Sequence, residues 1–347
     1  MDKNNIRTIL IRGANWVGDA LMTTPVVEAI RHNFPEARIS LLVVPWVMDL
    51  FTHNPHSDEV IPYFREGRHK GLRGKRVLLK EIKGRKFDLS ILLQNAFEAA
   101  LLAWGARIPR RAGYNTDWRG WLLTHAVPLR PEYKKVHQTQ YYLAMARGLG
   151  LEAPDTDMFL QVPDEYTTYI HSRLKRYGYE GRPLIVLAPG ATYGSAKMWP
   201  GERYSLLATE LARYCGAGLI ILGSVQEKGV GDGIVRGVGQ EMAVNLSGAT
   251  SLLEAAAWIK QATLVISNDS GLMHMAAALS KPQLAIFGPT NRITTGPRNR
   301  KAHIIYHETA CAPCLKVRCP TDHKCMASIT VEEIFEAACR MLSTYSS

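Results

Sequence analysis

An aspartate follows a glycine loop near the start of the chain, where a phosphate-binding loop would carry a lysine. The stretch "ILIRGANWVGDALMTTP" has Gly13 and Gly18 at the spacing of the phosphate-cradling motif G-x-x-x-x-G-K-[ST]. That motif continues with Lys and then Ser or Thr, whereas this chain has Asp19 and Ala20. A carboxylate would repel a triphosphate, and alanine cannot hold its magnesium ion. The loop is therefore expected to bind something other than a nucleoside triphosphate.

A second candidate site lies in "VISNDSGLMHMAAAL", in the other half of the chain. A strand is expected to stop at "SND" and a helix to begin near Ser270, with Asn268 or Asp269 as its cap. Gly271 allows a ligand close to the backbone, and the free amides of the first helical turn suit a pyrophosphate. An ordinary capped helix, with its histidine buried in the core, is the alternative.

Two further loops after apolar runs carry charged residues. In "APGATYGSAKMWP", Lys197 leaves a loop expected to be held by a packed Trp199 and Pro200. A lysine so placed neutralises phosphate charge as a bond to that phosphate breaks; a surface lysine is the alternative. In "LGSVQEKG", Glu227 stands where a carboxylate could accept a hydrogen bond from a ribose hydroxyl, or could simply be solvated.

The positive charge of the chain is concentrated in its first half. The formal net charge is +11, and residues 1–150 hold 23 Lys and Arg against 13 Asp and Glu, while residues 151–347 hold 19 against 18. The densest stretch, residues 65–86, has ten Lys or Arg. A solvated helix face, nucleic acid, anionic lipid and an acidic glycan would each suit this charge. Nucleic acid is disfavoured, because no zinc-finger spacing or aromatic-rich strand pattern accompanies it.

Short apolar runs alternate with helical patterns, which predicts α/β domains with parallel strands. The 347 residues suit two domains, a first of residues 1–160 and a second of residues 161–330, followed by a C-terminal helix in residues 331–347. Strands are expected in residues 6–11, 37–44, 87–93, 183–190, 217–224, 262–269 and 282–289, and helices near 24–33, 70–84 and 95–104. The first apolar run is too short for a secretory signal, and no run reaches the roughly 20 residues of a membrane span, so a cytoplasmic location is expected.

Three local features leave alternatives. Pro25 either opens a helix with Thr24 as its cap or kinks one begun at Asp19. "PDTD" is an Asp-x-Asp in the Pro-rich linker and is interpreted as a turn rather than a metal site. A cysteine cluster in "CAPCLKVRCPTDHKC" predicts either a structural metal such as zinc or free, redox-labile thiols. Its members are Cys311, Cys314, Cys319 and Cys325.

Three motifs together carry a family resemblance. "WVGDALMTTP", "PGATYGSAKMWP" and "SNDSGLMHMAAALSKPQLAIFGPT" resemble, in order and spacing, the lipopolysaccharide heptosyltransferases of glycosyltransferase family 9, and most of all the heptosyltransferase II branch. The resemblance implies a GT-B architecture, with two Rossmann-like βαβ domains facing an interdomain cleft. The acceptor would occupy the first domain and ADP-heptose the second, with no metal or other cofactor required.

The resemblance also implies roles for individual residues. Asp19 matches the general base and Lys197 the lysine near the pyrophosphate. The donor-binding set is Thr192, Lys197, Glu227, Asp269, Ser270, Gly271, Leu272 and His274. The acceptor-binding set is Gly18, Asp19, Arg65, Arg68 and Arg119.

The expected function is inverting transfer of heptose to the inner core of lipopolysaccharide, at its first heptose. The expected partners are ADP-heptose, a lipid A-linked acceptor and the anionic cytoplasmic face of the inner membrane, where the protein would be a peripheral monomer. A GT-B nucleotide-sugar epimerase and a nonenzymatic basic nucleic-acid-binding protein are the alternatives. A dinucleotide dehydrogenase is disfavoured, because no G-x-G-x-x-G follows a strand.

Overall fold

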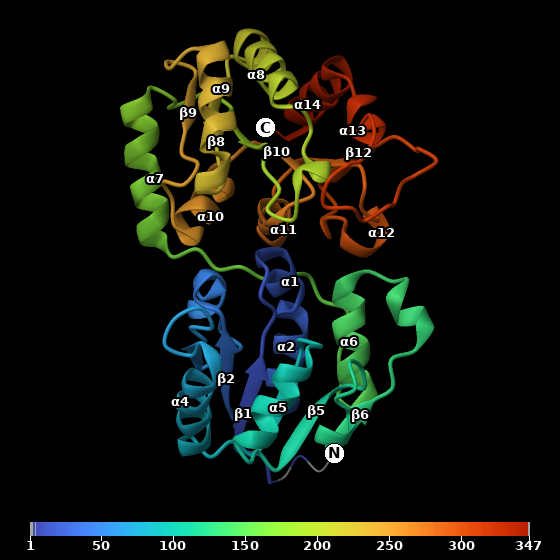
Figure 1. Ribbon diagram of the computed structural model, residues 1–347. Coiled ribbons are helices and arrows are strands. Elements are labelled where there is room, and N and C mark those ends of the chain that lie inside the picture. Colours follow the sequence, from blue (N-terminus) through green and yellow to red (C-terminus); the bar gives the residue numbers. More distant parts are fainter. Residues whose placement is uncertain (1–2, 4, 346–347) are drawn as a thin grey trace. The chain divides into compact units, whose positions relative to one another are not determined.

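The chain forms two compact units, Met1–Gln161 and Val162–Ser347, in a computed structural model that describes residues 3 and 5–345 (Figure 1). Each unit contains a six-stranded sheet in which every strand pairs in parallel with its neighbours. Helices connect successive strands, as parallel pairing requires. The predicted α/β class, with two Rossmann-like units, is confirmed.

The strands of the first unit have the order β3-β2-β1-β4-β5-β6. Their bounds are β1 Thr8–Arg12, β2 Arg38–Val43, β3 Glu59–Pro62, β4 Leu89–Leu92, β5 Arg110–Tyr114 and β6 His125–Val127. From β1 the chain first adds strands on one side of it and then, from β4 on, on the other. The strand order therefore reverses between β1 and β4, which is where open α/β sheets bind ligands at their carboxyl edge.

Helices cover both faces of this sheet. They are α1 Val17–Met22, α2 Thr24–Asn33, α3 Asp49–Thr52, α4 Gly71–Gly84, α5 Phe97–Gly105 and α6 Gln138–Gly148, with short 3₁₀ turns η1 Pro45–Val47, η2 Gly120–Leu122 and η3 Pro131–Lys134. Leu78 and Ile82 of α4 and Ala100 and Ala103 of α5 pack in one core cluster with strand residues such as Leu92. Helix α2 contacts α6 and contributes no residue to this cluster, as expected if a right-handed crossover places it on the opposite face.

The chain around Pro25 combines the two arrangements expected for it. A first helix, α1, ends before Thr23, and α2 begins at Thr24 with Pro25 in its first turn. The residue at the N-cap position is Thr23 rather than Thr24. The hydroxyl of Thr23 donates to the carbonyl of Ala20 at 2.6 Å, and this hydrogen bond links the residue between the two helices to α1.

The second unit repeats the plan with the strand order β12-β11-β10-β7-β8-β9, which reverses between β7 and β10. Its strands are β7 Leu184–Ala188, β8 Gly218–Ile221, β9 Ala243–Asn245, β10 Leu264–Asn268, β11 Gln283–Phe287 and β12 Ala302–Tyr306. Its helices are α7 Asp164–Tyr177, α8 Gly201–Cys215, α9 Lys228–Val238, α10 Leu252–Gln261, α11 Gly271–Ala278, α12 Arg292–Thr295, α13 Lys324–Ala327 and α14 Val331–Tyr345, with 3₁₀ turns η4 Ser195–Lys197 and η5 Val225–Glu227. Helix α14 packs against α8 and contributes Ile334, Ala338 and Leu342 to the core of this unit.

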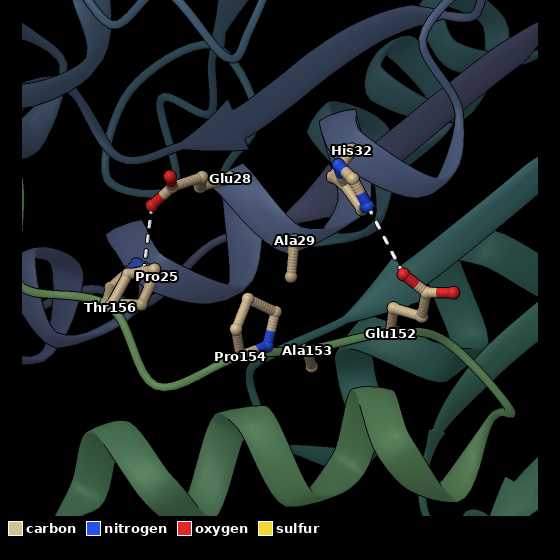
Figure 2. A pocket seen from close by; sticks show the side chains of 8 residues that line it. All are labelled: Pro25, Glu28, Ala29, His32, Glu152, Ala153, Pro154 and Thr156. Carbon is tan, nitrogen blue, oxygen red and sulfur yellow. Dashed lines mark hydrogen bonds and ion pairs between the residues drawn. The ribbon is translucent and has the colours of Figure 1, made fainter.

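The segment of residues 151–163 has no helix, strand or turn, so the turn expected at "PDTD" is wrong. The first part of this segment is instead bonded along α2. The hydroxyl of Thr156 donates to Glu28 at 2.8 Å, and the amide of Phe159 donates to the hydroxyl of Thr24 at 2.8 Å. Between segment and helix lies a cavity of about 400 Å³, with the Glu28–Thr156 bond on one side and the His32–Glu152 contact on the other (Figure 2).

Candidate active site

Asn268, the last residue of β10, joins the two loops at the strand-order reversal of the second unit. Its side chain is fully buried. The side-chain oxygen accepts from the amide of Trp199 at 3.1 Å and from the hydroxyl of Tyr204 at 3.2 Å. The side-chain nitrogen donates to the carbonyl of Pro189 at 2.6 Å. One amide therefore fixes both ends of the loop that follows β7.

Lys197 and Asp269 meet at this reversal. The Nζ atom of Lys197, from the loop after β7, lies 2.7 Å from Oδ2 of Asp269, which directly follows β10. The hydroxyl of Thr290, from the loop after β11, donates to the same oxygen at 2.6 Å. The two charged side chains are 14% and 4% exposed, so the pair is largely withdrawn from water. Tyr193 adds a cation–π contact, with its ring centroid 5.0 Å from Nζ.

Helix α11 begins beside this ion pair. Its N-cap residue is Ser270, whose side chain makes no capping hydrogen bond. The predicted capping by Asn268 or Asp269 is wrong, because both side chains bond to neighbouring loops instead. The hydroxyl of Ser270 is buried and has no hydrogen-bond partner among the described residues. The first turn of α11 thus presents amides and a buried hydroxyl that a ligand can engage.

The remaining predicted donor residues lie around the same edge of the sheet. Oε2 of Glu227 accepts from the amide of Ser224 at 2.6 Å and from its hydroxyl at 2.9 Å, in a capping box. A Cβ atom on Gly190 would lie 1.8 Å from Oε1 of Glu227, so the carboxylate packs directly on the loop after β7 and leaves space only for glycine there. Thr192 is exposed in that loop, whereas His274 is 4% exposed within α11. Gly271 and Leu272 form the first turn of α11.

The cysteine-rich segment covers the loop that carries Lys197. The amide of Ala196 donates to the carbonyl of Val317 at 3.1 Å, and the hydroxyl of Tyr193 donates to the carbonyl of Leu315 at 3.1 Å. Nε2 of His323 lies 2.7 Å from the carbonyl oxygen of Ala196. The segment therefore fixes the backbone next to the lysine.

The prediction of a structural zinc at this segment is not supported. Within residues 3 and 5–345, no group of three or more His, Cys, Asp or Glu side chains is arranged to hold a metal ion. Cys325 is buried against Gly288 and Met326, and burial raises the pKa of its thiol. Cys311 is exposed at the surface. Cys314 and Cys319 are partly exposed, so the four thiols range from buried to exposed.

The glycine loop with Asp19 occupies the equivalent place in the first unit. The amide of Gly13 donates to the carbonyl of Leu42 at 3.1 Å, and a Cβ atom on Gly13 would lie 2.7 Å from Val43, so only glycine fits. Asp19, half-buried, follows Gly18 in the first turn of α1, where a carboxylate is favoured by the helix dipole. Burial, and to a lesser extent the negative charge of Asp19, raises the pKa of Tyr142 on α6.

A charged network stands at the same sheet edge. Arg12, at the end of β1, donates to the carbonyl of Gly13 at 2.6 Å, and burial lowers the pKa of this arginine to about 10. Lys75 of α4 forms an ion pair with Glu98 of α5, and both bond to the hydroxyl of Tyr63. Hydrogen bonds and an ion pair thus hold two of the basic side chains of the first unit, Arg12 and Lys75, in fixed positions near the end of β1.

The three arginines predicted to bind an acceptor lie in two environments. Arg65 and Arg68 are exposed after β3, and Arg68 pairs with Glu81 at 3.1 Å. Arg119 is fully buried. Its guanidinium donates to the carbonyls of Tyr114 and Gln94 and to the side chain of Asn95, so that in this structure it orders the loop after β4.

Sequence reasoning missed Thr290 and Tyr193, which complete the surroundings of Lys197. Both occur in stretches that the resemblance covers, "FGPT" and "ATYG", but neither has a motif spacing of its own. Thr290 lies 93 residues from Lys197, and only the pairing of β10 with β7 and β11 brings their loops together. One feature of the sequence could have indicated Thr290: it follows an apolar run closely, and the loops after parallel strands are where open α/β sheets bind ligands.

Known proteins resemble this chain in both sequence and fold. The model of glycosyltransferase family 9 (heptosyltransferase) matches residues 75–325. Lipopolysaccharide heptosyltransferase 2 of Salmonella typhimurium is 31% identical over 304 residues, covering 86% of this chain and 87% of that protein. The structure of ADP-heptose lps heptosyltransferase II from E. coli superposes with a TM-score of 0.84 at 27% identity, covering 99% of this chain and 100% of that one. A family 9 glycosyl transferase from Veillonella parvula shares the fold, with a TM-score of 0.89 at 23% identity and 99% of each chain covered.

The fold and these matches define a glycosyltransferase of the GT-B class. More particularly, the chain belongs to glycosyltransferase family 9, the heptosyltransferase family. The resemblance inferred from the three sequence motifs is confirmed.

Replacing Asn268 by Ala should lower the free energy of unfolding by about 2–5 kcal/mol, because the buried Trp199 amide, Tyr204 hydroxyl and Pro189 carbonyl lose their partner. Urea unfolding measures the loss. Asn291 provides the control: it caps the short helix α12 through Ile293, and its replacement by Ala should cost only about 1 kcal/mol. Equal losses in the two variants would show that Asn268 does not fix the loop.

Proposed function

We propose that this enzyme transfers a heptose from ADP-heptose to the first heptose of the lipopolysaccharide inner core, with inversion at the anomeric carbon. The observation that carries the proposal is the Lys197–Asp269–Thr290 network beside the uncapped start of α11, at the strand-order reversal of the second unit. Such a place, with a cation and free helix amides, suits a diphosphate. The related protein from E. coli is described as an ADP-heptose heptosyltransferase.

In this proposal the second unit holds the donor. The pyrophosphate lies on the amides of Ser270, Gly271 and Leu272, and the orphaned hydroxyl of Ser270 donates to it. Thr192 and His274 complete the set of donor contacts, with Glu227 accepting from the ribose. Lys197 stabilises the charge that grows on ADP as the glycosidic bond breaks, which makes its effect larger in the transition state than in the ground state.

The first unit holds the acceptor, with Asp19 as the general base. The acceptor hydroxyl loses its proton to the Asp19 carboxylate as its oxygen bonds to the anomeric carbon, while the carbon–oxygen bond to ADP breaks. A single displacement of this kind inverts the centre. Arg65 and Arg68, both exposed, are positioned for carboxylates or phosphates of the acceptor, and Arg119 acts by ordering the loop after β4. The reaction needs no metal ion in this scheme, because Lys197 and backbone amides supply the positive charge.

The excess of basic residues in the first unit supports an acidic, lipid A-linked acceptor and a peripheral location at the anionic cytoplasmic face of the inner membrane. Across residues 3 and 5–345, every helix falls short of the length or the apolar character needed to cross a bilayer. We further propose that the enzyme acts as a monomer.

A transfer assay with ADP-heptose tests the function directly. Acceptors bearing zero, one and two heptoses are compared, and turnover is expected mainly with the one-heptose acceptor. An epimerase of the same fold class would instead convert the nucleotide sugar with no acceptor present. Consumption of donor without acceptor, or turnover only with the heptose-free acceptor, would contradict the proposal.

Replacing Asp19 by Asn should lower the single-turnover rate roughly 10²–10⁴-fold, because the variant keeps the size of the side chain but not its basicity. The melting temperature and the affinity for ADP should change little. Asp49 is a matched control, since it also lies in the first turn of a short helix of the first unit. Asp49→Asn should leave the rate unchanged, and near-normal transfer by Asp19→Asn would refute general-base catalysis.

Replacing Lys197 by Ala should lower the transfer rate roughly 10²–10³-fold and reduce the affinity for ADP less. The variant should also lose stability, because Asp269 keeps a buried charge without its partner. Adding Asp269→Asn should restore much of the stability but not the rate. The exposed pair Lys228–Asp232, also at 2.7 Å, is the control, and Lys228→Ala should affect neither property strongly. Recovery of transfer in the double variant, or loss of ADP binding with normal turnover of bound donor, would contradict the role of Lys197.

A further inference from the structure

Helix α5 is apolar on both of its faces, although it lies at the surface of the first unit. Ala99, Ala100, Leu102 and Ala103 are buried toward the sheet. Spacings of four and three residues place Phe97, Leu101 and Trp104 together on the outer face, where they are 38%, 42% and 51% exposed. The charged residue of this helix, Glu98, is paired with Lys75 of α4. The outer face of α5 therefore offers water a continuous apolar stripe.

The turn after β5 extends this stripe. Trp121 of η2 lies with its ring centroid 6.3 Å from that of Phe97 and is 70% exposed. Trp118, in the same turn, is 92% exposed. Asp117 and Trp118 both have positive φ values, of 52° and 59°. Residues other than glycine adopt this backbone conformation only at an energetic cost.

Buried Arg119 holds this turn in place through the carbonyls of Tyr114 and Gln94. A ring that is almost wholly exposed adds nothing to the core, so packing does not account for the strained turn. The apolar surface made by the turn and α5 is called the α5 patch and consists of Phe97, Leu101, Trp104, Trp118 and Trp121.

Basic helix α4 borders the α5 patch. The two helices are in contact, and both are labelled in the first unit in Figure 1. The side chain of Leu79 lies against Gly105 at the end of α5. Arg76 and Lys83, three residues before and four after Leu79, therefore lie on the side of α4 nearest α5. Both are exposed, and neither forms an ion pair with any carboxylate of the described chain.

We propose that the α5 patch and the adjoining side of α4 dock on an anionic lipid bilayer surface. Exposed tryptophans suit the interface between headgroups and acyl chains, and Lys and Arg beside them suit anionic headgroups. This inference rests on the proposed lipid-linked acceptor. It also gives that acceptor a route, because α5 begins at the carboxyl edge of β4, beside the strand that leads to Asp19.

A second copy of the chain fits this surface less well. A two-fold interface would bury the same patch on both copies and bring their two basic α4 helices together. The resulting like-charge repulsion opposes association, whereas an anionic membrane neutralises the same charges.

Vesicle binding by the full chain tests the inference, with vesicles of phosphatidylglycerol and phosphatidylcholine compared with phosphatidylcholine alone. Leu101→Ser with Trp104→Ser and Trp118→Ser should weaken binding at least roughly tenfold. Arg76→Glu with Lys83→Glu should weaken vesicle binding about fivefold or more per residue. This loss should be seen only with the anionic vesicles and at low salt. Urea unfolding confirms that the variants are folded, and Trp118→Ser alone, at a fully exposed site, should still weaken binding measurably.

Matched controls come from the second unit. Leu206→Ser with Tyr214→Ser removes two exposed apolar side chains of α8, and Lys175→Glu with Arg176→Glu reverses two exposed charges of α7. Both should bind vesicles as the unaltered chain does. Losses as large as those of the patch variants would overturn the assignment of the surface.

Two readouts separate this inference from the proposed function. With a deacylated, water-soluble acceptor, the patch variants should transfer heptose at the normal rate, whereas an unaltered chain inactive on every heptose acceptor would refute the function alone. Unchanged vesicle binding by the patch variants would refute the docking surface alone. Conversion of a dimer to a monomer by those variants, with vesicle binding intact, would identify a second copy as the occupant instead.

Discussion

The side-chain amide of Asn268 is the constraint on which the second unit's site depends. Two of its hydrogen bonds join the end of β10 to the two ends of the loop after β7, and a third comes from Tyr204 of α8. Because that loop is fixed, Lys197 reaches Asp269, whose Oδ2 bonds to Lys197 and Thr290 rather than to the amides of α11. A single buried polar side chain thus determines both where the cation stands and which helix amides are left for a ligand.

In the first unit, two arginines fix the loops at the carboxyl edge of the sheet. Arg12 ends the central strand and holds the glycine loop by its carbonyl, while Arg119 orders the loop after the neighbouring strand. Both are buried, and burial lowers the pKa of each to about 10. With positive charge already built into this sheet edge, the residue left half-buried beside it is the acid, Asp19. In the proposed mechanism the two reversals carry complementary groups: Asp19 takes a proton and Lys197 stabilises the departing anion.

The sequence was most informative where one local pattern determines one element. The helix expected near residues 24–33 is α2, and the apolar runs at 183–190 and 262–269 are β7 and β10. The edge strands β9 and β12 were missed, because β9 is three residues long and only partly buried, and β12 has one neighbour and a single buried residue. Lys197 and Asp269 were each identified, but not their ion pair, which depends on strand order. The capping of α11 was predicted wrongly. The local sequence makes Asn268 and Asp269 suitable caps, but in the folded chain both side chains bond to loops that are distant in the sequence.

The segment of residues 151–163 is bonded to each unit close to the boundary between them. Its last bond within the first unit is made by the amide of Phe159, and the carbonyl of Val162 already accepts from Lys260 of the second unit at 3.4 Å. Only Leu160 and Gln161 lie between these anchors, so the extended chain from Phe159 to Val162 spans roughly 10 Å. With only these few residues between the bonds to one unit and the bonds to the next, the connection is a short linker rather than a long flexible tether.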